Sequence, residues 1–241
     1  MMKNPSAEET RKLCARMKSH ILSRLPHFAH YSARIPLRII AAAALLTLPS
    51  AACAATVSKV YQADLTPLNE SAGGGARGTV TLTVNGDELT IEAEVTGLNP
   101  PGMHMIHIHG FTTGDKAATC AGPEQDENSD GIIDLIETEP VSGTTLIPFH
   151  DQPESLGIPS DKYPVADGEG KFTYKKTVSL KELNEGLKKT FGIDDVQLDK
   201  RVVYVHGVPD TPPLPDTVAS LPGVPAKMTL PVACGVIREV K

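Results

Sequence analysis

Histidines 104, 107 and 109 lie within six residues of one another. Side chains two residues apart in a strand share a face, so we expect His107 and His109 to point the same way, roughly 7 Å apart at their Cα atoms. His104 would point to the opposite face. A later apolar segment ends in His206. Neutral imidazoles bind copper, zinc or iron, so these residues are candidate metal ligands; solvated or core histidines are the alternative.

A second group of residues has the spacing of a calcium-binding loop. Residues 126–137 match the pattern D-x-[DN]-x-[DN]-G-x-x-x-x-x-E at every position. Calcium prefers six or seven oxygen ligands. Five side chains and one carbonyl would supply them, from Asp126, Asn128, Asp130, Ile132 (carbonyl), Asp134 and Glu137. Pro123 and Pro140 flank the loop and argue against a paired EF-hand domain, so we predict a lone calcium loop; a solvated acidic loop is the alternative.

An apolar stretch near the N-terminus has the features of an export signal. Residues 39–48 are almost entirely apolar, follow Arg34 and Arg38, and precede the small residues Ala52-Cys53-Ala54. This order is that of a cleavable secretory signal. We therefore expect residues 1–54 to be a leader and residues 55–241 to form one exported domain, periplasmic or extracellular. A lipoprotein attached at Cys53 and a short buried helix are the alternatives.

Charge and composition exclude one large class of partner. Residues 1–54 carry eight Lys or Arg and two acids, whereas residues 55–241 carry 15 Lys or Arg and 27 acids, a net charge of −12. Such an acidic domain, with few aromatic residues, does not favour nucleic acid. We expect a small molecule or metal ion as ligand, and leave a homodimer open. Cys120 and Cys234 are an even pair in an oxidising compartment, which favours a disulfide over two unrelated buried thiols.

The elements that must position these residues are mostly strands. Residues 79–84 and 89–95 alternate apolar and polar around Asn85-Gly86, which predicts a hairpin with a type I′ turn. Further strands are predicted at 57–64, 103–109, 144–149, 170–178, 201–206 and 230–240. Many short strands with Gly and Pro between them indicate an all-β sandwich or barrel. One helix is predicted after Ser179, with Leu180, Leu183, Leu187 and Phe191 as its apolar stripe. The Pro-rich residues 208–229 would form a long loop.

In this order the motifs resemble the Cu,Zn superoxide dismutase family. The resemblance rests on His104-x-x-His107-x-His109, Cys120-Ala-Gly-Pro123, Val203-Tyr-Val-His206 and Ala233-Cys-Gly-Val-Ile237, and it covers most of residues 56–241 in patches. It implies a Greek-key β-barrel or flattened sandwich, copper ligands at His107, His109 and His206, and a supporting role for His104. It also implies that Cys120 pairs with Cys234.

The departures from the family pattern affect the second metal. Glu124 stands where the family's bridging histidine follows Ala-Gly-Pro, and the remaining zinc ligands have no counterparts in residues 125–170. We therefore expect no zinc site. Pro231 replaces the family's substrate-guiding arginine. His150 is a candidate fourth copper ligand, or an ordinary residue at the end of a strand.

Two functions follow from these observations. The first is an exported copper protein, similar to superoxide dismutases, in which copper redox cycling dismutates superoxide. The second is a non-catalytic secreted module that binds copper, calcium or both. Whether the chain is an enzyme is left open at this point.

Overall fold

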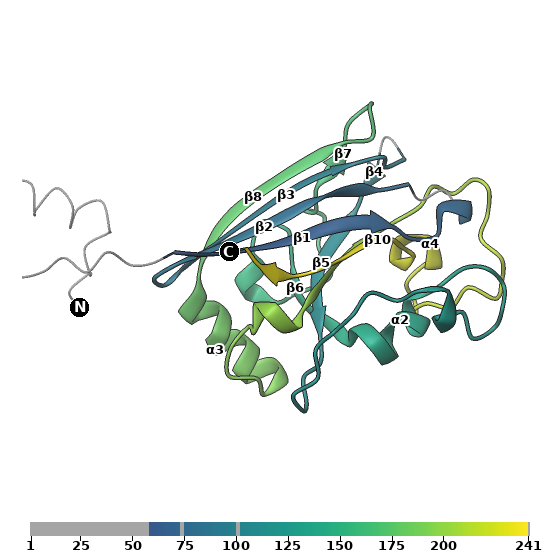
Figure 1. Cartoon of the computed structure of the whole chain (residues 1–241). Coiled ribbons are helices and arrows are strands. Elements are labelled where there is room, and N and C mark those ends of the chain that lie inside the picture. The colour runs from purple at the N-terminus through teal and green to yellow at the C-terminus, as the bar shows by residue number, and fades with distance from the viewer. Residues whose placement is uncertain (1–57, 73–74, 100–101, 241) are drawn as a thin grey trace, which may run out of the picture. The chain divides into compact units, whose positions relative to one another are not determined.

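Antiparallel strands dominate the computed structural model, which describes residues 58–72, 75–99 and 102–240 (Figure 1). The predicted leader, residues 1–54, lies outside these residues. The strands are β1 Lys59–Pro67, β2 Arg77–Asn85, β3 Glu88–Thr96, β4 Gly102–Met103, β5 Met105–Gly110, β6 Thr144–Pro148, β7 Val165–Ala166, β8 Phe172–Ser179, β9 Val202–His206, β10 Pro231–Val236 and β11 Arg238–Glu239. The α-helices are α2 Leu135–Ser142, α3 Leu180–Phe191 and α4 Ala226–Thr229. In the part of the chain described, no helix has the length and apolar character needed to cross a bilayer.

Most of the strands join one curled antiparallel sheet. Its order is β6-β5-β9-β10-β1-β2-β3-β8, with β11 also paired to β1, while β4 and β7 form a separate pair. The chain crosses between the two halves of the sheet after β3, after β6 and after β8. Such long returns between antiparallel strands are Greek-key connections. The predicted all-β Greek-key architecture is confirmed.

One core fills the inside of the curl. Leu82 of β2 and Ile91 of β3 belong to the same buried cluster as Ile106, Ile108 and Val205. Because side chains alternate along a strand, the residues between these isoleucines on β5 face away from the core. The histidine-bearing face of β5 and β9 is therefore the outer face, and it is covered by loops and short helices.

The predicted hairpin forms, but its turn lies one residue later than expected. Asn85 pairs with Glu88, so the two central residues are Gly86 and Asp87. Gly86 has φ 62°, while Asp87 is not among the residues with positive φ. A type I′ turn needs positive φ at both central residues, whereas a type II′ turn needs it only at the first, where glycine is preferred. The backbone therefore follows the second pattern.

The predicted helix also forms, and it packs as its apolar stripe requires. The Ser179 hydroxyl accepts a hydrogen bond from the Glu182 backbone N–H, and Gly192 ends the helix in the left-handed region. Leu183 and Leu187 are fully buried in the main core. A second helix, α2, was not predicted. It begins at Leu135, and the side chain of the preceding residue, Asp134, caps it by accepting hydrogen bonds from the backbone N–H groups of Ile136 and Glu137.

Candidate metal centre

The imidazoles of His107, His109 and His206 meet on the outer face of β5 and β9. One ring nitrogen of each lies within 4.8 Å of the others. The ring centroids are separated by 5.2 to 5.8 Å. Each residue is at most 3% exposed. The structure thus brings together the three residues that the sequence named as copper ligands, including the one that lies almost one hundred residues later.

Strand register explains this convergence. β5 and β9 are antiparallel, with His107 opposite Tyr204 and Met105 opposite His206. His206 is therefore the diagonal neighbour of His107 on the same face, within reach of a long side chain. Between Ile108 and His109 the pairing of β5 with β6 shifts by a bulge. Bulges re-aim side chains, and this one lies at His109, the second of the three histidines.

Contacts outside the group fix which nitrogen of His107 carries the proton. The Tyr163 hydroxyl donates to the backbone oxygen of Ile158 at 2.9 Å. Its oxygen also lies 2.9 Å from His107 Nε2. Because the hydroxyl has one proton, it must accept from Nε2–H. His107 Nδ1 then keeps its lone pair, and this buried atom has no hydrogen-bond partner.

The other two rings are held in the same manner. His206 Nδ1 lies 2.8 Å from the backbone oxygen of Thr229, which can only accept, so Nδ1 carries the proton. His109 Nε2 lies 3.2 Å from the Thr145 hydroxyl. His206 Nε2 is buried without a hydrogen-bond partner. The His109 ring also forms a hydrogen bond with the backbone of Gly143, the residue before β6. His107 and His206 therefore each present one free nitrogen.

Burial keeps the three imidazoles neutral. Desolvation is the largest cause in each case, and it lowers the pKa of His109 to about 3 and that of His206 to about 4. The pKa of His107 is lowered well below its usual value by burial and by the neighbouring histidines. Neutral imidazole is the form that binds metals. Buried lone pairs without partners, as on His107 and His206, are costly unless an ion satisfies them, so these residues fit a transition metal.

Two tyrosines near the centre were not identified from the sequence. Tyr204 lies among the rings, with its centroid 5.1 Å from His109 and 5.8 Å from His206. Its hydroxyl accepts from the Ala121 N–H and contacts the Ser142 hydroxyl at 2.7 Å. Strand parity could have found Tyr204, because it is two residues from His206. Tyr163 carries no such signal, since it belongs to a distant loop.

The predicted disulfide is confirmed. Cys120 and Cys234 are bonded, across 114 residues of sequence. The bond ties the segment before η2 (Pro123–Gln125) to β10, beside the face that carries Tyr204. The covering loop is therefore held to the sheet both covalently and through the Ala121 contact with Tyr204.

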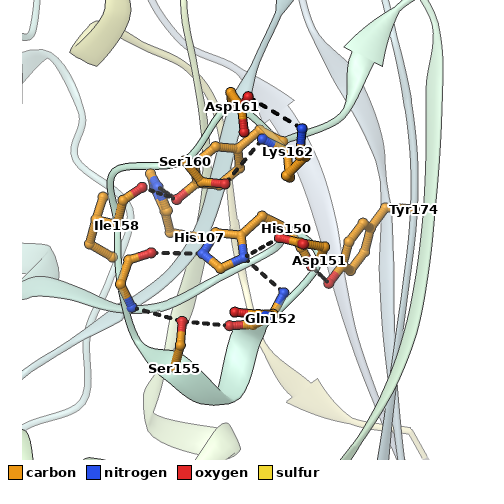
Figure 2. Close-up of polar contacts among 12 residues, drawn as sticks. His107, His150, Asp151, Gln152, Ser155, Ile158, Ser160, Asp161, Lys162 and Tyr174 are labelled. Carbon is orange, nitrogen blue, oxygen red and sulfur yellow. Dashed lines mark hydrogen bonds and ion pairs between the residues drawn. The ribbon is translucent and has the colours of Figure 1, made fainter.

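His150 does not join the three histidines. Its Nδ1 accepts from the Gln152 backbone N–H at 3.0 Å, and its Nε2 lies 2.7 Å from the backbone oxygen of Gly157 (Figure 2). Both nitrogens are thus occupied, and the Tyr163 ring contacts both His150 and His107. The structure holds His150 as a residue that fixes its own loop, rather than as the fourth ligand that the sequence suggested.

His104 lies where the sequence placed it, behind the metal face. It is buried, and its Nδ1 lies 3.2 Å from the backbone oxygen of His206. Burial lowers the pKa of His104. It contacts the backbone of a ligand residue rather than the ligand rings. Glu124, at the family's bridging position, lies in η2 with its carboxylate folded over Gly122, and it is not part of the three-histidine group.

The predicted calcium loop has the backbone of such a loop, but its acidic oxygens contact protein. Gly131 has φ 81°, and helix α2 begins directly after Asp134. Asp126 accepts from the N–H groups of Asp130 and Gly131, and Glu137 accepts from those of Glu127 and Asp134. Among the described residues, the loop carboxylates do not converge as the three histidines do. Calcium binding stays a prediction.

Asn69 attaches this loop to the barrel. Its amide donates to the backbone oxygen of Ile133 and accepts from the Ile133 N–H, each at 2.8 Å. The same amide donates to the Pro231 oxygen at the start of β10. A single side chain thus supplies both backbone bonds at the centre of the loop.

A small cavity lies beside His109, on the side of β6 and α2. Its volume is about 90 Å³, and it is lined by His109, Thr145, residues of α2 and Leu221. Only a molecule of a few atoms fits such a space.

Comparison with known proteins gives a likeness in structure but none in sequence. No protein-family model matches the sequence, and no curated protein is significantly similar to it. Among solved structures, the chain is similar to a Cu/Zn superoxide dismutase from Brucella abortus, with 18% identity over 74% of this chain and 99% of the other, and a TM-score of 0.34. At this identity and TM-score the likeness identifies neither a family nor a ligand for this chain.

Proposed function

We propose that this chain is an exported copper-binding protein whose single copper ion is held by His107, His109 and His206. One observation carries the proposal: three buried imidazoles each bring one ring nitrogen within 4.8 Å of the others. Imidazole donors bind copper more tightly than the other divalent first-row metals. The resemblance in sequence to Cu,Zn superoxide dismutases supports copper as the ion.

The surrounding residues prepare the site for that ion. Tyr163 and the Thr229 carbonyl orient the rings of His107 and His206 and set their protonation, and Thr145 contacts the ring of His109. Such outer contacts raise the affinity of a metal site by limiting ring rotation. Bound copper would supply reversible one-electron transfer.

Superoxide dismutation is the activity that we propose to test first. Two features of the chain oppose fast turnover of an anion. The domain after residue 54 has a net charge of −12, which does not attract anions. Pro231, rather than an arginine, lies at the start of β10 opposite His206. A non-catalytic module that stores or delivers copper is therefore the second candidate.

Metal analysis and activity separate these functions. The protein is expressed with its leader, and copper, zinc and calcium are counted per chain. Superoxide decay is then measured for the copper-loaded protein, for His206→Ala and for His150→Gln. If the chain is a superoxide dismutase, His206→Ala should lose copper and activity, whereas His150→Gln should keep both. If the protein retains copper but superoxide decays no faster than with free copper, the non-catalytic module is supported. The absence of bound copper would refute both candidate functions.

Export accounts for the disulfide. A bond between Cys120 and Cys234 is stable in an oxidising compartment and rare in the cytosol. We therefore propose a periplasmic or extracellular location. A periplasmic protein should be protected from added protease in intact cells and released when the outer membrane is disrupted. An extracellular protein should not be protected.

A further inference from the structure

A second cavity lies beside the metal centre, where β5 begins. Its volume is about 350 Å³. Its walls come from residues before and within β5, from the segment after β9 and from α4. Four of the residues that line it carry sulfur or imidazole donors: Met103, His104, Met105 and Met228.

Met103, Met105 and Met228 are all the methionines that the described residues contain. The chain has six, and the other three, Met1, Met2 and Met17, precede the described part. Buried methionine usually fills gaps in a core. Here none of the three belongs to a hydrophobic core cluster, and Met228 is 37% exposed. The three methionines therefore line one cavity for a reason other than core packing.

His104 lines the same cavity, but backbone groups contact its ring. Its Nδ1 lies 3.2 Å from the His206 carbonyl oxygen, and the ring also forms a backbone hydrogen bond with Asn99. A Cβ on Gly102, another lining residue, would lie 3.6 Å from Nε2 and 3.7 Å from the Asn99 oxygen. The donors that remain for a ligand in the cavity are the three thioethers.

The donor set selects the charge and softness of the ion. Thioethers are soft ligands that favour monovalent copper over zinc, calcium or magnesium. The nearest charged residues, Asp210 and Lys227, form an ion pair with each other. Because no unpaired carboxylate lines the cavity, the charge of a divalent ion would remain uncompensated. A monovalent ion is less costly to desolvate.

We propose that this cavity binds one Cu(I) ion through the thioethers of Met103, Met105 and Met228. The site adjoins the three-histidine centre, because Met105 is paired with His206 and shares a strand face with His107. It would therefore serve as the docking point from which copper enters that centre by ligand exchange, without a redox step. This delivery role rests on the proposed function, but binding in the cavity does not.

The test uses the full chain and Ag(I), a redox-inert monovalent ion that prefers the same donors. The methyl groups of methionine are labelled with carbon-13 and assigned by single Met→Leu variants. We expect the signals of Met103, Met105 and Met228 to shift together and to saturate at one equivalent. Independent shifts at unequal ion concentrations, or saturation of Ag(I) without these shifts, would overturn the proposal.

Two variants separate the cavity from the metal centre. M103L/M105L/M228L keeps side-chain volume and should lose one bound Cu(I) in competition with a Cu(I) chelator. H107A/H109A/H206A should still show the methyl shifts with Ag(I), so that failure of the proposed function leaves this result intact. Val240→Met, which adds an exposed thioether elsewhere, should bind no additional ion. Unchanged Cu(I) binding in the triple leucine variant would refute the site.

Discussion

The hydroxyl of Tyr163 lies 2.9 Å from Nε2 of His107 and donates its own proton to the Ile158 carbonyl. The arrangement gives a residue 56 positions away control over the protonation of a metal ligand. It also links the 150–163 loop to the metal centre, because the same ring contacts His150. The loop therefore does more than cover the site.

Replacement of this tyrosine should weaken metal binding. In Tyr163→Phe, Nε2 of His107 loses its acceptor, so the ring can rotate or change tautomer. Loss of such an outer contact typically costs 10- to 100-fold in metal affinity, and we expect about that loss of copper affinity in a chelator competition. Tyr174→Phe is the matched control, because the Tyr174 hydroxyl also donates to a backbone carbonyl of this loop, that of His150, but does not contact His107. Equal affinity in the two variants would contradict this role.

The metal-free protein should lose stability in mild acid. The pKa values of His109 and His206 are about 3 and about 4 in the folded chain, against 6.5 when exposed. Below pH 6.5 the unfolded chain therefore binds protons that the folded chain does not, and the unfolding free energy falls with pH. Each histidine contributes about 1.4 kcal/mol per pH unit between pH 6.5 and its folded value.

This pH dependence is measured by urea denaturation of the apo protein between pH 7 and pH 5, above the range where most carboxylates titrate. His109→Asn should reduce the slope, because one of the titrating groups is gone. An unfolding free energy that stays constant across this range would show that the histidines are not buried in the neutral form.

Removal of the disulfide should loosen the covering loop as well as the fold. The chain-entropy model assigns roughly 4–5 kcal/mol to closure of a loop of this length, as an upper value. We expect C120A/C234A to unfold at lower denaturant concentration, and hydrogen exchange of the Ala121 amide, which donates to Tyr204, to accelerate. A reductant should produce the same change in the wild type and none in the double variant. Exchange at Ala121 that is unaffected by either treatment would refute the link.

The alternation of residues predicted most of this architecture. The 79–84 and 89–95 segments formed a hairpin, and His107 and His109 share a face because they are two residues apart. Helix α2 was missed because Asp134 and Glu137 were interpreted only as calcium ligands, although Asp134 also caps a helix. Pro140, which argued against a paired EF-hand domain, lies within this helix.

The contacts outside the ligands could not be predicted. The Thr229 group that orients His206 is a backbone carbonyl, which every residue type offers. Tyr163 is positioned by the path of a loop rather than by a strand period. The sequence left His150 open between a fourth ligand and a strand-end residue for a related reason, since its ring nitrogens contact backbone groups within seven residues. Sequence spacing thus locates residues on regular strands, whereas loop closure decides which residues surround them.

Calcium should stabilise the wild-type protein if the 126–137 loop binds it. Glu137 is the test residue, because a closing carboxylate in this position supplies two oxygens to the ion. In the structure both of its oxygens accept backbone hydrogen bonds, from Glu127 and Asp134, which a bound ion would replace or share.

We expect calcium to raise the melting temperature of the wild type and of Glu139→Gln, a variant in the same helix outside the pattern. Glu137→Gln should show no such rise, because one oxygen and the charge are lost. A calcium response that is equal in both variants would assign the effect to some other site, and no response in the wild type would leave the loop as a purely structural turn, held by Asn69 and the cap of α2.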